Sequence, residues 1–268
     1  SRYETKVGYK VIEGLREWGY KGEIYPVNPR SDKVHGLKAY PTVKDIPYAV
    51  DLVFVAVPAH IVKSVLEDCV AKKVNIVVIA TSAFKEIGRG QLQNDLTQYC
   101  RDNKLPLIGP NLVGMGSPYL NFNCGFIPYL PMEGPVAMIS QSGANLLAAL
   151  GTSQKDHFGM SFFVGLGNKA DVDFCEFVSY AGIDDDTKCL AIYIEGLDSP
   201  EGFVEACQKV DKPIVTIKVG GSKIGVKAAF AHTASENEGT GDAYYDEVFQ
   251  KAGAIRATTW QEFLDVSL

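Results

Sequence analysis

His232 is the residue whose surroundings best suit chemistry in this sequence. It lies in a polar stretch rich in small residues, positions 219–241, which follows the apolar run 214–219. A histidine on a core helix would have apolar neighbours three and four positions away, whereas His232 is flanked by Ala, Thr, Ser, Gly and Asn. We therefore expect its ring on a loop, where an imidazole can act near neutral pH as a base, a metal ligand or a nucleophile.

Two glycine-containing segments, SQSGA and GNKAD, each follow an expected strand and precede an expected helix. Their candidate anion-binding residues are Ser140, Gln141, Ser142 and Gly143 in the first, and Gly167, Asn168, Lys169 and Ala170 in the second. Free backbone N–H groups at a helix N-terminus attract anions. Each segment alone is better explained as an ordinary capped turn. The pair, followed by His232, favours a phosphate site.

Glu195 ends another apolar run and is followed by Gly196. A carboxylate there can orient a histidine ring and stabilise its positive or phosphorylated form; the alternative is a cap for the next helix. Asp171 and Asp173 are better explained as helix N-caps than as catalysts. Three histidines have no comparable neighbours and are expected to be surface or packing residues: His35, His60 and His157.

The six cysteines do not point to metal or disulfide chemistry. None lies within four positions of another, so neither a CxxC motif nor zinc-knuckle spacing is present. Buried free thiols in a reducing compartment are the expected state. No metal site is expected, and the serines of SQSG lack the GxSxG pattern of serine hydrolases.

Composition is that of a globular protein, because 46% of the 268 residues are hydrophobic and 22% are charged. The net charge of −6, with Lys and Arg scattered, argues against nucleic acid as the main partner. No apolar run is long enough to cross a bilayer and no signal peptide is evident, so no membrane partner is expected. The expected location is cytoplasmic.

Short apolar runs alternate with helical patterns, which is typical of parallel α/β folds. We expect strands at residues 23–27, 51–57, 75–80, 106–109, 135–140, 160–165, 188–195 and 213–219. In the second half we expect helices at residues 145–155, 173–180, 200–210 and 242–252. The stretch 118–133 lacks a clear period, which indicates a linker or a crossing segment. The prediction is two doubly wound domains, residues 1–124 and 125–268, with a first strand missing ahead of the first helix.

The first half has no GxGxxG, so ordinary NAD binding and an oxidoreductase are disfavoured. Its segments after strands combine basic and apolar residues, with Lys6, Arg30 and Lys33 able to meet phosphates and Val57 and Pro58 offering apolar contact. An anionic, partly apolar cofactor would suit this mixture.

In chain order, the segments KVGY, IYPVNP, VDLVFVAVPA, GPN, ISQSGA, GNKADVD, YIEG and AHTAS resemble the NDP-forming acyl-CoA synthetases. This superfamily includes acetate–CoA ligase (ADP-forming) and the succinyl-CoA synthetase α subunit. The resemblance implies a Rossmann-like CoA-binding domain followed by a flavodoxin-like ligase domain. It also implies the reversible reaction of a carboxylate, CoA and ATP to acyl-CoA, ADP and phosphate, through an acyl phosphate and a phosphohistidine.

By that resemblance His232 carries the phosphate, the two glycine turns bind it and Glu195 stabilises the ring. The positions that match the family's coenzyme A contacts are Ser1, Lys6, Pro29, Lys33, Val57, Pro58, Thr81, Ser82 and Asn111. The resemblance further implies an ATP-grasp domain or β subunit, which would bind ATP or ADP with Mg2+, and assembly into an oligomer. We expect this chain to be a subunit or a fragment of a fused enzyme, with the fragment favoured.

Two departures from the family pattern stand near His232. Ala234 occupies a position where the family commonly has Gly, and the following segment SENEGTGDAYYDEVF is longer and more acidic than usual. The alternative function is a catalytically reduced module that senses CoA or acyl-CoA. Retention of His232, Glu195 and both glycine turns favours the enzyme. The sequence does not name the carboxylic acid.

Overall fold

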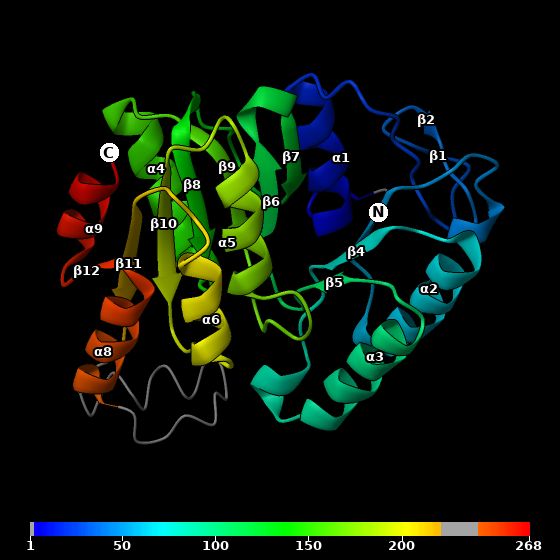
Figure 1. Ribbon diagram of the computed structural model, residues 1–268. Helices are drawn as coiled ribbons and strands as arrows, with labels where there is room; N and C mark the ends of the chain where they lie inside the picture. The colour runs from blue at the N-terminus through cyan, green and yellow to red at the C-terminus, as the bar shows by residue number, and fades with distance from the viewer. Residues whose placement is uncertain (1–2, 221–240) are drawn as a thin grey trace. The chain divides into compact units, whose positions relative to one another are not determined.

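The computed structural model describes residues 3–220 and 241–268, which form two compact units. The first unit comprises Ser1–Leu130 and Lys169–Val172, and the second comprises Pro131–Asn168 and Asp173–Leu268. Each contains parallel strands connected by helices (Figure 1), so the α/β class predicted from the sequence is confirmed.

The first unit is built on a three-stranded parallel sheet of order β3-β4-β5. Its helices and strands are α1 (Val7–Glu17), β1 (Lys33–Val34), β2 (Leu37–Lys38), β3 (Leu52–Val55), α2 (Ala59–Lys72), β4 (Ile76–Ile79), α3 (Gly90–Asp102), β5 (Leu107–Ile108), β6 (Gly114–Ser117) and β7 (Phe122–Gly125), with short 3-10 helices at Val43–Asp45, Lys85–Ile87 and Pro118–Leu120. Helices α2 and α3 make the crossovers between the parallel strands, and their buried faces pack on the sheet around Leu66, Val77 and Leu96.

Two predictions for this unit are wrong. The stretch expected to be a linker contains β7, which pairs antiparallel with β6 and packs against α1. Residues 23–27, expected to be a strand, form only an isolated bridge between Val27 and Tyr40. A strand needs a partner for its backbone groups, and residues 22–25 make no backbone hydrogen bond within the described chain.

The second unit contains five parallel strands in the order β12-β11-β10-β8-β9. Its elements are β8 (Glu133–Ser140), α4 (Gly143–Asp156), β9 (Met160–Gly165), α5 (Phe174–Ile183), β10 (Cys189–Ile194), α6 (Pro200–Cys207), β11 (Ile214–Lys218), α8 (Asp242–Ala252), β12 (Ile255–Ala257) and α9 (Trp260–Ser267). The sequence predicted the first four strands and four of the helices closely, but it missed β12 and α9.

Numbered from β8, this order is 2-1-3-4-5, the flavodoxin-like order of doubly wound sheets. Helices α5, α6 and α8 pack side by side on one face, while α4 and α9 cover the other (Figure 1). With helices on both faces, the strands are mostly apolar and buried, as in β9, where all six residues of MSFFVG are buried. The chain first steps from β8 to β9 and then returns past β8 to β10, so the order reverses at β8.

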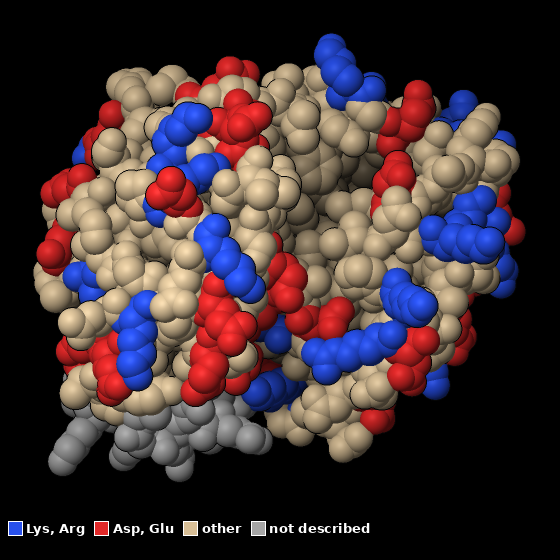
Figure 2. All heavy atoms as spheres, viewed as in Figure 1, with Lys and Arg blue, Asp and Glu red and all other residues tan. Residues whose placement is uncertain are grey.

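Within the described ranges, no helix combines the length and the apolar character needed to span a membrane. On the face drawn in Figure 2, Lys and Arg are intermixed with Asp and Glu, and neither charge forms a broad patch. This agrees with the scattered charge of the sequence.

Candidate functional site

The predicted phosphate-site segments follow adjacent strands of the second unit. Ser140 ends β8, Gly165 ends β9, Ile194 ends β10 and Lys218 ends β11. Ser140 pairs with Gly165 on one side and with Tyr193 on the other, and Ile194 pairs with Lys218, so the four strand ends lie along one edge of the sheet. In doubly wound sheets ligands bind beyond the carboxyl ends of the strands, at the point where strand order reverses. The segments after β8 and β10 flank that point.

Gln141 connects the first glycine turn to the segment after β10. Its side-chain Oε1 accepts hydrogen bonds from the backbone N–H groups of Glu195, at 3.0 Å, and Gly196, at 3.1 Å. Its own N–H donates to the carbonyl oxygen of Tyr193 at 3.1 Å. The Gln141 side chain is buried, so these bonds fix the backbone of Glu195 at the edge of the sheet.

The turn after β8 leads directly into α4. Ser142 is the N-cap of this helix, and its hydroxyl accepts from the N–H of Asn145. Ser140 Oγ donates to the Ser142 carbonyl oxygen at 2.8 Å. Within the described chain, the N–H groups of Gly143 and Ala144 donate no hydrogen bond. These two N–H groups and the positive end of the helix dipole are suited to an anion.

The turn after β9 differs from the prediction. Gly167 and Lys169 adopt positive φ angles of 60° and 50°, but no helix begins directly after them. Helix α5 begins at Phe174, and its N-terminus is capped by Asp173 and by Glu176 in a reciprocal capping box. The carboxylates of this box already satisfy N–H groups of the first turn. The anion-binding helix end expected behind this segment is therefore not available.

Lys169 and Ala170 belong to the first unit, together with Asp171. The N–H of Ala170 donates to the carbonyl oxygen of Gly109 at 2.9 Å. The Asp171 carboxylate pairs with Arg101 at 2.7 Å and accepts from the N–H of Leu107. Asp171 is thus held by an ion pair and is not the predicted helix N-cap, whereas the prediction for Asp173 is confirmed.

Glu195 does not cap the helix that follows it. The N-cap of α6 is Ser199, whose hydroxyl accepts from the N–H of Gly202. The alternative explanation for Glu195 as a helix cap is therefore excluded. Burial raises the pKa of Tyr193 to about 12, and the charge of the half-buried Glu195 side chain acts in the same direction.

Sequence reasoning missed Asn145, Tyr193 and Tyr245. Asn145 Nδ2 donates to Ser142 Oγ at 3.0 Å and to the Tyr193 hydroxyl at 2.9 Å. The Tyr245 hydroxyl, from α8, accepts from the N–H of Leu197. No motif marks these residues, because each lies inside a helix or strand and only the tertiary fold brings its polar group to the sheet edge.

Lys218 is a further polar residue at this sheet edge that was not predicted from the sequence. It ends β11, is half-buried, and its ammonium nitrogen lies 4.6 Å from the centre of the Tyr245 ring. Burial lowers the pKa of Lys218 below its usual 10.5, while the Asp242 carboxylate acts in the opposite direction. In the sequence, the feature that could have indicated Lys218 is its position at the end of the mostly apolar strand IVTIK.

His232 lies outside the described residues, as does Ala234. The structure places the end of β11 beside β10 and so beside Glu195; the proposed role of the histidine stays a prediction. Among residues 3–220 and 241–268 no group of three potential metal-ligating side chains is found.

In the first unit, three of the predicted coenzyme A positions meet at the carboxyl ends of the strands. Thr81 Oγ1 donates to the Val57 carbonyl oxygen at 2.7 Å, and the N–H of Asn111 donates to the Thr81 carbonyl oxygen at 3.0 Å. Asn111 has a positive φ of 62° and follows a cis Gly109–Pro110 peptide. Pro58 is the N-cap of α2, which has no side-chain cap. The neighbouring Ser82 is exposed.

The basic candidates lie on exposed parts of the same unit. Lys6 is the N-cap residue of α1, and that helix N-terminus also lacks a side-chain cap. Lys33 stands directly opposite Lys38 in the β1–β2 hairpin, a like-charged cross-strand pair that is unfavourable unless an anion is near. Pro29 is exposed in the preceding turn. Ser1 lies outside the described residues.

Comparison with known proteins agrees with this arrangement. Residues 133–268 match the family model "Succinyl-CoA ligase like flavodoxin domain", and residues 1–117 match the model "CoA binding domain". The chain belongs to this family of NDP-forming acyl-CoA synthetases, with a CoA-binding domain followed by a flavodoxin-like ligase domain.

Individual relatives are ADP-forming ligases. The chain is 38% identical to acetate–CoA ligase (ADP-forming) of Methanocaldococcus jannaschii, over 99% of this chain and 37% of the relative. It is 36% identical to acetate–CoA ligase (ADP-forming) I subunit alpha of Pyrococcus furiosus, over 97% of this chain and 58% of that subunit. The chain thus spans only part of the length of these relatives.

A solved structure with a similar fold is acetyl-coenzyme A synthetase 1 of Ca. Korarchaeum cryptofilum, in complex with phosphate and ADP. The TM-score is 0.92 and the identity 34%, with 98% of this chain and 57% of that chain covered. The match extends over both units and confirms the family.

Proposed function

We propose that this chain is the CoA-binding and phosphate-relay part of an ADP-forming acyl-CoA synthetase. The complete enzyme would convert a carboxylate, CoA and ATP to acyl-CoA, ADP and phosphate. The observation that carries the proposal is the fixed edge at β8 and β10, where Gln141 holds Glu195 beside the open N-terminus of α4.

The second unit would hold the phosphate. The free N–H groups of Gly143 and Ala144 supply hydrogen bonds to phosphate oxygens, and the α4 dipole adds a favourable potential. The Glu195 carboxylate would accept a hydrogen bond from the ring N–H of His232, which would leave the other ring nitrogen to carry the phosphoryl group. Lys218 adds a positive charge at the same edge when it is protonated.

The first unit would hold coenzyme A. Its uncapped helix N-termini at Lys6 and Pro58, and the paired charges of Lys33 and Lys38, suit the phosphates of this polyanion. The apolar side chain of Val57 suits its less polar part. Coenzyme A, as substrate, supplies the thiol that accepts or releases the acyl group.

In the acyl-CoA-cleaving direction, a phosphate oxygen attacks the thioester carbonyl and the CoA thiolate leaves, which forms an acyl phosphate. A ring nitrogen of His232 then attacks phosphorus, and the carboxylate leaves. The chain's residues lower the barrier by holding phosphate in place and by stabilising the positive ring. Transfer to ADP with Mg2+ would need an ATP-grasp domain or subunit, which we propose as the partner.

Labelling on histidine tests the proposal. The chain is incubated with radioactive phosphate and each member of an acyl-CoA panel that begins with acetyl-CoA. We expect label that is stable in base and lost in acid, and no label in the His232→Asn variant. Equal labelling of His232→Asn and the unchanged chain would refute the phosphohistidine.

Glu195→Gln distinguishes an enzyme from a CoA-sensing module. It retains shape and hydrogen bonding but removes the charge that stabilises the ring, so labelling should fall while CoA binding, measured by calorimetry, stays unchanged. If the chain binds CoA but its histidine is not labelled with any acyl-CoA of the panel, the result would instead support the sensing module.

A further inference from the structure

Tyr193 carries a hydroxyl group to the sheet edge of the second unit. It is the last residue but one of β10, and it pairs with Ser140 of β8 and with Ile217 of β11. Tyr193 is only 6% exposed, and its ring packs edge-on with Trp260 of α9, with the ring centres 6.1 Å apart. The side chain therefore lies on the sheet face that α4 and α9 cover, and its hydroxyl reaches the first turn of α4.

Asn145 orients this hydroxyl. It lies in the first turn of α4, and its carboxamide nitrogen donates to the Tyr193 hydroxyl oxygen at 2.9 Å and to Ser142 Oγ at 3.0 Å. A carboxamide has two N–H hydrogens, so each of these hydroxyl oxygens receives one of them. A hydroxyl that accepts a hydrogen bond from one neighbour turns its own hydrogen toward another. The hydroxyl hydrogens of Ser142 and Tyr193 thus point away from Asn145.

The Tyr193 hydroxyl hydrogen has no acceptor among the residues that the structure describes. Burial raises the pKa of Tyr193 to about 12, so at neutral pH the hydroxyl keeps its hydrogen and acts as a donor rather than as a base. Buried hydroxyl groups normally donate to an acceptor. This one lies at the same helical turn as the free N–H groups of Gly143 and Ala144, and an acceptor that suits all three donors is an anion.

We propose that the Tyr193 hydroxyl is a further donor to bound phosphate, and that Asn145 is the residue that positions it. The inference rests on the proposed function, because the phosphate is the one that we assign to the N-terminus of α4. The hydroxyl would donate to one phosphate oxygen while the N–H groups of Gly143 and Ala144 donate to others. Donors from a strand and a helix fix the orientation of the phosphate as well as its position, and a further oxygen is left to attack the thioester carbonyl.

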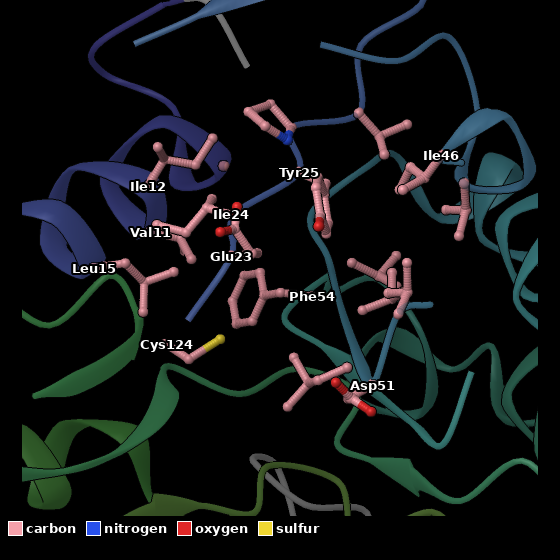
Figure 3. Close-up of a pocket in the computed structure, with 18 of the residues that line it drawn as sticks. Val11, Ile12, Leu15, Glu23, Ile24, Tyr25, Ile46, Asp51, Phe54 and Cys124 are labelled. Atoms are coloured by element: carbon pink, nitrogen blue, oxygen red, sulfur yellow. The ribbon is translucent and has the colours of Figure 1, made fainter. Parts of the chain in front are cut away.

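A cavity of about 490 Å³ in the first unit offers no comparable site for phosphate. Phe54 lies at its centre, and the labelled side chains around it are mostly apolar (Figure 3). The two charged lining residues, Glu23 and Asp51, are both acidic, and no Lys, Arg or His is among the lining residues that the structure describes. Phosphate would meet negative charge there without a compensating cation, so its binding reports on the second unit.

The test is calorimetry with inorganic phosphate and with sulfate. It compares the unchanged chain with Tyr193→Phe, Asn145→Ala and the double variant. Tyr193→Phe removes the hydroxyl but retains the ring that packs with Trp260. Tyr180→Phe is the matched control, because Tyr180 is an exposed residue of α5 whose ring contact with Phe162 is likewise retained.

We expect Tyr193→Phe to weaken phosphate binding by about tenfold or more, as the loss of a hydrogen bond to a charged group does. Histidine labelling should slow as well. The melting temperature should stay within about 4 °C of the unchanged chain, which separates the loss of a donor from a loss of structure. Tyr180→Phe should match the unchanged chain in every measurement.

Sulfate determines the direction of the hydrogen bond. It has the tetrahedral shape of phosphate but carries no hydrogen at neutral pH, so a hydroxyl that donates should contribute to the binding of both anions. We expect Tyr193→Phe to weaken sulfate binding by a similar factor. If this variant weakens phosphate binding alone, the hydroxyl accepts the hydrogen of phosphate instead of donating, and the proposal is overturned.

The double variant tests whether Asn145 positions the hydroxyl. Asn145→Ala removes the carboxamide but keeps the Ser142 cap, which accepts from the backbone N–H of residue 145. The Tyr193 hydroxyl is then free to rotate, so phosphate affinity should fall. The further cost of Tyr193→Phe should be smaller in this background than in the unchanged chain. An equal cost in both backgrounds would overturn the positioning role of Asn145.

Failure of this inference and failure of the proposed function give different results. If the unchanged chain binds phosphate and is labelled on histidine, but Tyr193→Phe binds phosphate equally well, the hydroxyl has no part in binding. The inference is then overturned and the proposed function stands. If the unchanged chain neither binds phosphate nor becomes labelled, both are overturned.

Discussion

The Gln141 carboxamide oxygen accepts the backbone N–H of Glu195 at 3.0 Å and so joins the segments after β8 and β10. It also accepts the N–H of Gly196. Gln141→Leu keeps the approximate shape but leaves both N–H groups without this partner, and the Gly196 backbone is buried. We expect a loss of unfolding free energy of about 1–3 kcal/mol, measured by urea denaturation, together with weaker histidine labelling.

Gln98→Leu is the matched control for that change. The Gln98 side chain is exposed and donates to Asp102 within α3, so its loss should change stability by less than about 0.5 kcal/mol. If the two substitutions lowered the unfolding free energy equally, the bonds from Glu195 and Gly196 to Gln141 would contribute no more to stability than an exposed hydrogen bond.

A substitution at Thr81 tests the proposed coenzyme A site at the sheet edge of the first unit. Thr81→Val retains the branched shape but removes the hydroxyl that bonds the Val57 carbonyl oxygen at 2.7 Å. A loss of about 1 kcal/mol in the bound state corresponds to about a fivefold weaker CoA affinity, which calorimetry measures. Thr152→Val, which removes a hydroxyl bond to Ala148 within α4, should leave CoA affinity unchanged. A similar loss of affinity in both variants would contradict the assignment.

The second unit was predictable because each of its early strands is a continuous apolar run with a small, polar turn behind it. β9 was predicted to the residue, at Met160–Gly165. β12 was missed because its three residues, Ile255–Ala257, are too short to show a period and follow a helix closely. The hairpin of β6 and β7 was missed because its glycines and neighbouring prolines are also typical of a linker.

Candidate site residues were predictable only at or just after the end of a strand. Ser140 ends β8, Gln141 follows it and Glu195 follows β10, and their contacts lie at one sheet edge. The anion-binding helix N-terminus predicted behind the turn after β9 is not present, because Asp173 and Glu176 cap α5 themselves, which the sequence does not show. Asn145 and Tyr193 were missed since their contact joins residues 48 positions apart.

The cysteines should react slowly in the folded protein. Burial raises the pKa of Cys69, Cys100, Cys124 and Cys207 to about 12. A shift from 9 to 12 lowers the thiolate fraction at mildly alkaline pH by about a thousandfold. We expect iodoacetamide to modify the half-buried Cys175 and Cys189 first, as seen by peptide mass spectrometry, and all six thiols after unfolding in urea. Fast modification of the four buried thiols in the folded chain would contradict the packing.

Lys218 should make stability depend on pH. Burial lowers its pKa in the folded state below the usual 10.5, so between the two pKa values the unfolded chain binds more protons. Unfolding free energy therefore rises with pH across that window through this residue. The four buried thiols have the opposite effect above about pH 9, because their folded pKa values are raised. The contribution of Lys218 to the pH dependence is therefore obtained from the difference in unfolding free energy between the unchanged chain and a variant that lacks this lysine.

Lys218→Met supplies that difference. It retains an unbranched apolar stem beside Tyr245 but has no charge to bury, so we expect higher stability than the unchanged chain at neutral pH and a smaller difference near pH 10.5. Urea denaturation across this range measures it, with the exposed Lys188→Met as control. Lower stability of Lys218→Met at neutral pH would show that Asp242 and Glu195 hold the charge favourably.

Phosphate binding should be linked to the same proton. An anion at the edge formed by β8, β10 and β11 favours the charged form of Lys218, so binding should take up a proton where this lysine is otherwise neutral. Phosphate affinity should then fall as pH rises through the pKa of Lys218, and Lys218→Met should bind more weakly at neutral pH without that dependence. Calorimetry in buffers of different ionisation enthalpy measures the proton uptake. An identical pH profile for the variant and the unchanged chain would place the phosphate beyond the influence of Lys218.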